Sequence, residues 1–133
     1  AEIFMLATHV MNPSMIISAW EAIVLERKVL VKCSKPSLIA PCCEFFRRLV
    51  LPYVVVNTYV PVLSEQLLTA IEAPFPYLVG ADTAILSKYP WIDLSDTVVI
   101  DLDSRMVTFP KYASVRAPKS MVDRLSKEIS AGV

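Results

Sequence analysis

Glycine is scarce in this sequence, where only Gly80 and Gly132 occur among 133 residues. Phosphate-cradling loops and dinucleotide-binding turns need clustered glycines, because glycine adopts positive φ freely and lets the backbone approach a phosphate. The sequence therefore contains no Walker loop, no Rossmann fingerprint and no nucleophile elbow. Whole classes of nucleotide-dependent enzymes are excluded on this ground.

An excess of charge is also lacking, since 13 Lys and Arg residues balance 13 Asp and Glu residues. This balance excludes the broad positive field of a general nucleic-acid binder or a polybasic membrane protein. The longest charge-free stretches, Ile3–Trp20 and Leu49–Ser64, are interrupted by proline and polar residues. Neither is typical of a spanning helix, which needs about 20 mostly apolar residues. We expect no nucleic-acid partner and no transmembrane segment.

Histidine and cysteine are too few and too poorly spaced to indicate a metal or redox centre. His9 is the only histidine, and no second ligand follows it at helical spacing, so a structural role is favoured over catalysis. The three cysteines are odd in number and lack metal-ligand spacing, which indicates a reducing compartment, and Cys42 and Cys43 are expected to be buried packing residues. We therefore expect a cytoplasmic protein with no cofactor, no metal ion and no covalent catalysis.

What the sequence has in excess is apolar surface. Apolar residues make up 55% of the chain and charged residues 20%, and the mean hydropathy is +0.52. A piece of a larger protein with bare interfaces explains this composition better than a membrane protein does. The length suits a single domain over residues 1–133, and the absence of an initiating methionine agrees with a fragment.

Helical patterns alternate with short β-branched runs along the chain. A helix capped by Asn12 is expected to end near Glu26, and a shorter one capped by Ser64 is expected to carry Leu67, Leu68 and Ile71. The remaining elements are a helix from Pro36 that ends at Pro52, a helix capped by Ser120 and Asp123, strands 29–33, 53–62, 77–80 and 97–102, a hairpin return at 106–109, and a loop with one helical turn at 81–96. This order predicts an α/β three-layer sandwich around a mostly parallel sheet with an antiparallel edge hairpin.

Asp101 and Asp103 follow the hydrophobic strand at i and i+2, so they project to one side about 6.5 to 7 Å apart at a rise of ~3.3 Å per residue. This pattern resembles the first motif of haloacid-dehalogenase-type phosphatases, which implies Mg²⁺ with Asp101 as nucleophile and Asp103 as general acid/base. Ser104-Arg105 stands where that family has Gly-Thr. The favoured interpretation is structural: both carboxylates cap the strand and turn the hairpin.

Five blocks, in order, resemble the central module of the DENN domain family (cDENN). They are AWEAIVLERKVLV at 19–31, FRRLVLP at 46–52, YVPVL at 59–63, APFPYLVG at 73–80 and VVIDLD at 98–103. Val55 and Ser64 depart from the tryptophan and the proline that the family usually has at those positions. The resemblance implies the central α/β part of a DENN domain without its upstream longin-like and downstream helical modules.

The resemblance also implies a function in intact DENN proteins, which commonly act as guanine nucleotide exchange factors for Rab small GTPases in membrane trafficking. Such exchange needs no covalent chemistry, because the exchanger binds the nucleotide-free GTPase more tightly than the loaded one. The resemblance implies that the longin-like and α/β lobes share the GTPase surface, and it favours peripheral attachment to intracellular membranes. Candidate partner-binding residues are Glu65, Gln66, Glu72, Asp101 and Asp103. The alternatives are a DENN-like scaffold or GTPase effector without exchange activity and, more remotely, the Asp101 phosphatase.

Overall fold

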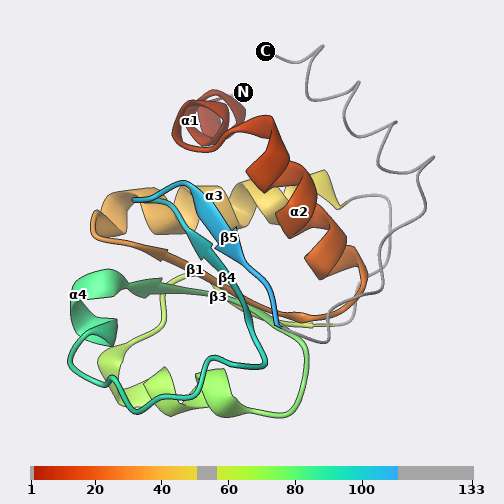
Figure 1. Ribbon diagram of the computed structural model, residues 1–133. Coiled ribbons are helices and arrows are strands. Elements are labelled where there is room, and N and C mark those ends of the chain that lie inside the picture. Colours follow the sequence, from red (N-terminus) through yellow and green to blue (C-terminus); the bar gives the residue numbers. More distant parts are fainter. Residues whose placement is uncertain (1, 51–56, 111–133) are drawn as a thin grey trace.

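A five-stranded sheet in the order β2-β3-β1-β4-β5 forms the centre of the computed structural model (Figure 1). The structure describes residues 2–50 and 57–110. The elements are α1 (Glu2–Val10), α2 (Pro13–Val24), β1 (Lys28–Cys33), α3 (Pro36–Leu49), β2 (Thr58–Val60), the 3₁₀ helix η1 (Glu65–Glu72), β3 (Tyr77–Asp82), α4 (Thr83–Leu86), β4 (Val98–Asp101) and β5 (Met106–Thr108).

Strand β1 is the centre of the sheet and pairs in parallel with β3 on one side and β4 on the other. The remaining neighbours differ in direction, since β2 pairs with β3 in parallel and β5 pairs with β4 antiparallel. Alternate residues of β1 enter two separate cores, with Val31 in one and Leu30 in the other. A strand that is buried on both faces reads as a continuous apolar run, which explains why the sequence predicted it. The predicted α/β sandwich with an antiparallel edge hairpin is confirmed.

The two faces of the sheet are covered differently, as Figure 1 shows. The helical face carries α1, α2 and α3, and the loop face carries η1, α4 and the irregular residues 87–97. The core of the helical face includes Trp20 and Phe46, whereas that of the loop face is built around Leu68, Ile71 and Tyr77. The parallel strands are connected through α3 on the helical face and through η1 and residues 83–97 on the loop face. With this strand order, all of these crossover connections have the same hand.

Helix α2 begins and ends as the local sequence dictates, with one strained residue. The Asn12 side chain accepts a hydrogen bond from the Met15 amide at 2.9 Å, which confirms the predicted cap. At the other end, the Glu26 amide donates to Ile23 O and the Arg27 amide donates to Ala22 O, each at 3.0 Å. This is a Schellman motif, whose residue with positive φ is normally glycine. Here Glu26 occupies it at φ 54°, so the turn stores a small backbone strain.

Gly80 marks the closest packing between β3 and its neighbours. A side-chain Cβ at this position would overlap the Cγ2 of Ile39 on α3 and the carbonyl oxygen of Pro61. The Gly80 carbonyl also accepts a hydrogen bond from the Leu63 amide at 2.7 Å. Glycine is therefore required here for the close approach of the backbone after β2.

The predicted helix at Ser64 is present but has a different period. Residues 65–72 form a 3₁₀ helix, in which residues three apart share a row, so Leu68 and Ile71 are buried together. Leu67 falls on another row and is 58% exposed. An α-helix, with 3.6 residues per turn, would have placed Leu67 and Leu68 nearer one face.

Most of the other predicted helices and strands that fall within the described residues are present. Strands 29–33, 77–80 and 97–102, the hairpin return and the helical turn within 81–96 are confirmed within one or two residues, and α3 matches the predicted second helix. Helix α1 was not predicted. Of the strand expected at 53–62 the described part contains only Thr58–Val60, whereas residues 51–56 and the helix expected at Ser120 and Asp123 lie outside the described residues.

Within residues 2–50 and 57–110, every helix is too short or too polar to cross a lipid bilayer.

Candidate partner-binding surface

The five residues selected from the sequence do not form one cluster. The carboxyl ends of the parallel strands lie at one edge of the sheet, where Asp101 and Asp103 end β4 and begin the hairpin. Helix η1 follows β2 and precedes β3, so it starts at this carboxyl edge with Glu65 and returns to the amino edge with Glu72 (Figure 1). Glu65, Gln66 and Glu72 are exposed on η1, whereas the side chain of Asp101 is only 27% exposed.

Asp101 is engaged in the turn of the hairpin. Its Oδ1 accepts hydrogen bonds from the amides of Asp103 at 3.0 Å and Ser104 at 3.3 Å. Its Oδ2 lies 3.8 Å from the Nζ of Lys32 on the neighbouring strand β1. Aspartate commonly closes a turn in this way, by bonding the backbone amides two and three residues on. The structural interpretation of Asp101 is therefore confirmed.

Asp103 joins the hairpin to the turn between β1 and α3. It accepts hydrogen bonds from the Ser34 amide at 2.9 Å and the Ser34 hydroxyl at 2.8 Å, and the Cys33 thiol donates a weaker one at 3.5 Å. These bonds, the Ser34 hydroxyl first, hold the pKa of Asp103 below its ordinary value. Asp103 remains exposed, yet its carboxylate is committed to positioning the hairpin.

The histidine and the helical cysteines are not arranged for catalysis or metal binding. His9 is exposed at the end of α1, rather than packed in the core, and its carbonyl accepts a hydrogen bond from Arg105 at 3.0 Å. Burial raises the pKa of the Cys42 thiol to about 12 and that of Cys43 further, as expected for packing residues. Among the described residues no three His, Cys, Asp or Glu side chains are grouped so that they could hold a metal ion.

On the loop face, η1 and residues 87–97 lie side by side and are bonded together. The Tyr89 hydroxyl donates to Glu65 Oε1 at 2.8 Å, and Lys88 Nζ lies 3.9 Å from the same oxygen. The Tyr89 ring meets Trp91 edge-on, with ring centroids 5.3 Å apart. Trp91 itself is 70% exposed. Glu65 thus fixes the tyrosine against which an exposed indole rests.

The sequence-based selection found Glu65 but missed Trp91 and Leu67. Trp91 lies in the weakly periodic segment 81–96, which was interpreted as a loop with one helical turn, and Leu67 was assigned to a helix together with Leu68 and Ile71. A tryptophan after a proline, outside any periodic pattern, was the available signal, because a core tryptophan normally falls on an apolar stripe. Exposed tryptophan is enriched among the residues that dominate protein interfaces.

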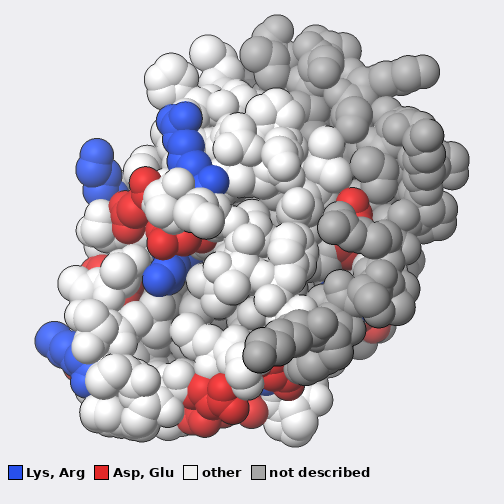
Figure 2. Space-filling view, viewed as in Figure 1, with Lys and Arg blue, Asp and Glu red and all other residues white. Residues whose placement is uncertain are grey.

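The loop face carries more acidic than basic residues, unlike the chain as a whole. Residues 64–97 contain five acidic residues and one lysine, although the chain as a whole is neutral. Lys28 from β1 pairs with Asp96 at 3.4 Å and offsets one of the five. In Figure 2 acidic side chains gather along the lower part of the view, where the loop face lies. The loop face therefore presents an acidic surface.

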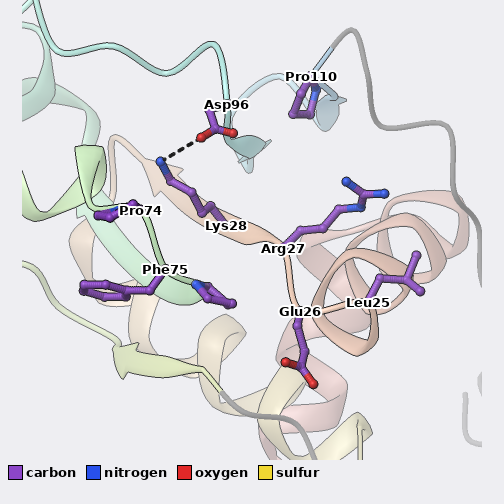
Figure 3. Close-up of a pocket in the computed structure, with 9 residues that line it drawn as sticks. Leu25, Glu26, Arg27, Lys28, Pro74, Phe75, Asp96 and Pro110 are labelled. Atoms are coloured by element: carbon purple, nitrogen blue, oxygen red, sulfur yellow. Dashed lines mark hydrogen bonds and ion pairs between the residues drawn. The ribbon is translucent and has the colours of Figure 1, made fainter.

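A hollow of about 520 Å³ lies at the amino edge of the sheet (Figure 3). It brings together two blocks that are far apart in sequence: Leu25–Lys28, from the end of α2, and Pro74–Pro76, from the crossover after η1. Asp96 and Pro110 complete the lining. The ammonium of Lys28 lies 5.6 Å from the centre of the Tyr77 ring as well as beside Asp96. Both blocks thus have an architectural role at this edge.

Comparison with known proteins gives one family. The sequence model of the DENN (AEX-3) domain matches residues 3–105. Similar proteins include DENN domain-containing protein 1A of Xenopus laevis, 28% identical over 110 residues that make up 83% of this chain and 11% of that protein. DENN domain-containing protein 1B of Mus musculus is 28% identical over 78% of this chain and 14% of that protein, and protein 2A of Mus musculus is 29% identical over 65% and 9%. The chain therefore spans about a tenth of the length of these relatives.

Proposed function

Because this chain belongs to the DENN domain family, we propose that it is the central α/β part of a guanine nucleotide exchange factor that promotes GDP release from a Rab small GTPase. The observation that carries the proposal is the match over residues 3–105, most of the chain. The matched region makes up only 11% of DENN domain-containing protein 1A, which leaves room for the longin-like and helical modules that we propose flank this chain. We place the intact protein in the cytoplasm, attached peripherally to intracellular membranes during trafficking.

The proposed mechanism is thermodynamic. A protein that binds the nucleotide-free GTPase more tightly than the GDP-bound form must weaken GDP binding by the same factor, since coupling between two ligands is reciprocal. Such a mechanism needs a docking surface rather than a nucleophile, a base or a cofactor. The hydrogen bonds that commit Asp101 and Asp103 to the hairpin agree with this requirement. The candidates Gln66 and Glu72 are exposed for contact with the partner, and Glu65 is exposed while one of its oxygens holds Tyr89.

Release of fluorescent GDP from a panel of Rab proteins, measured with the full-length protein that contains this chain, tests the proposal. We expect faster release from at least one Rab and little or none with residues 1–133 alone, since the GTPase surface is proposed to extend onto the longin-like lobe. No acceleration for any Rab would refute exchange activity.

A binding experiment separates exchange from a scaffold or effector function. The full-length protein should bind nucleotide-free Rab at least about fivefold more tightly than GTP-loaded Rab, which is the lower end of typical coupling between sites. A preference for the GTP-loaded form would instead assign an effector role. Turnover of a phosphate ester that is lost in Asp101→Asn would assign the phosphatase role.

A further inference from the structure

The loop face carries an exposed surface that we define by Glu65, Leu67, Tyr89, Trp91 and Asp93 and call the acidic aromatic surface. We propose that this surface is where the GTPase docks, inserting Trp91 into an apolar socket that is rimmed by lysine or arginine side chains of the GTPase. The inference rests on the proposed exchange function and adds the residues and the chemistry of the contact.

Two of the large exposed apolar side chains, Leu67 and Trp91, belong to this surface. Seven large apolar side chains are exposed among the described residues, and four of them, Val62, Leu67, Phe75 and Trp91, lie within residues 61–97. Trp91 and Leu67 are 70% and 58% exposed. Such side chains cost free energy in water, and their burial against a partner is the largest gain that an interface can make. Trp91 and Leu67 therefore supply the apolar part of the proposed contact.

Trp91 is also held in place before any partner arrives. The Tyr89 ring meets it edge-on at a centroid distance of 5.3 Å, and the Tyr89 hydroxyl is fixed by Glu65 at 2.8 Å. Glu65 belongs to η1, whose Leu68 and Ile71 are buried in the core of the loop face. A side chain on such a support loses little conformational entropy on binding, which favours a dominant contact.

The acidic surroundings of Trp91 select the partner. Asp93 lies two residues from Trp91, and hydrogen bonds from Ser95 hold the pKa of Asp93 below its ordinary value, so it carries a full charge at neutral pH. Glu65 on η1 is exposed as well, and Lys88, whose Nζ lies 3.9 Å from Glu65 Oε1, offsets part of its charge. A partner with acidic side chains would be repelled, whereas one with lysine or arginine would be attracted and could place a cation over the exposed indole. Complementary charge thus points to a basic rim on the GTPase.

The helical face supplies matched controls. Met5 on α1 is 71% exposed, close to the 70% of Trp91, and Arg48 on α3 is exposed. Substitutions at these positions change apolar exposure and charge on the opposite face of the sheet. They should leave binding unchanged if docking occurs on the loop face.

The experiment measures binding of immobilised nucleotide-free Rab to the full-length protein, using the Rab with the strongest exchange response. We expect Trp91→Ala to weaken binding at least about 30-fold, as for a dominant interface residue. Asp93→Lys should weaken binding and reduce its dependence on salt. Met5→Ala and Arg48→Glu should stay within twofold of the unmodified protein.

The outcomes that overturn the proposal are distinct. If the unmodified protein binds a Rab and Trp91→Ala binds it equally well, the docking surface lies elsewhere and only this inference fails. If no Rab binds the unmodified protein, the exchange function and this inference fail together. If Trp91→Ala lowers the melting temperature of the full-length protein by several degrees, Trp91 is buried against another part of the same protein, and the surface is not a docking site.

Discussion

The two faces of the sheet differ in how many apolar residues they bury and in the elements that cover them. The helical face buries 21 described apolar residues under three helices, whereas the loop face buries nine under a 3₁₀ helix, a single helical turn and a loop. Regular helices cover apolar surface efficiently because an entire stripe of side chains faces the sheet. A loop leaves side chains such as Trp91 outside. We infer that the helical face supplies most of the stability and that the loop face is free to serve recognition.

The strongest test of this contrast is to truncate one aromatic residue on each face. Phe46 on α3 is fully buried, so Phe46→Ala should lower the free energy of unfolding by about 3–5 kcal/mol. Trp91→Ala, on the exposed loop, should change it by less than about 0.5 kcal/mol. Chemical denaturation monitored by circular dichroism measures both. Similar losses for the two variants would contradict the division of roles.

Removal of the buried Tyr77 hydroxyl on the loop face is expected to have the next largest effect. The Tyr77 hydroxyl donates to Ile71 O at 2.6 Å and shares a 2.9 Å hydrogen bond with Thr97, all buried. Tyr77→Phe should cost about 1–3 kcal/mol, because it leaves buried polar groups unsatisfied. Equilibrium denaturation checks this value, and an unchanged midpoint would show that η1 needs no such anchor.

The same hydroxyl predicts a dependence on alkaline pH. Burial raises the pKa of Tyr77 to about 12, so the folded protein favours the neutral phenol. This contribution to stability is complete below the ordinary pKa near 10 and is lost as the pH rises from 10 toward 12. Tyr77→Phe should lose less stability than the unmodified protein over this range. Parallel denaturation curves of the two proteins at pH 9 and pH 11 measure the difference.

A smaller effect of opposite sign is expected at the end of α2. Glu26 occupies the left-handed position of the Schellman motif, at φ 54°. Glu26→Gly should relieve this strain and stabilise the protein by about 0.5–1 kcal/mol, after the greater entropy of glycine in the unfolded chain is included. Thermal unfolding measures the gain. A loss of stability would mean that the Glu26 side chain itself supports the hollow at the amino edge.

The smallest effect concerns the junction between the hairpin and the β1–α3 turn. Because Ser34 lowers the pKa of Asp103, the stability from this carboxylate is complete above its ordinary pKa and is lost as the pH falls through the lower, folded value. Asp103→Asn should therefore lose stability at neutral pH and show a weaker dependence on pH below about pH 4. Acid titration followed by circular dichroism compares the two proteins, and identical profiles would remove Asp103 from this role.

Most elements of the fold could be predicted because their signals are local. The strands β1 and β4 are continuous apolar runs, the Asn12-Pro13 cap starts α2, and Asp103 to Arg105 turn the hairpin. Of the candidate site, Glu65 was found as an exposed acid, whereas its bond to Tyr89 joins residues 24 positions apart and has no local signal. The exposure of Leu67 has the same origin, since the choice between 3.0 and 3.6 residues per turn was made by packing against the sheet.

The sequence by itself determined the order of helices and strands, their caps and the membership of the DENN family, because propensity, capping and motif spacing are properties of neighbouring residues. The tertiary structure alone decided that Asp103 bonds to Ser34 in the β1–α3 turn, that Glu65 supports Tyr89, and that Trp91 remains exposed on an acidic face. These outcomes depend on which distant segments meet. The crossover connections that produce the sheet order β2-β3-β1-β4-β5 bring those segments together.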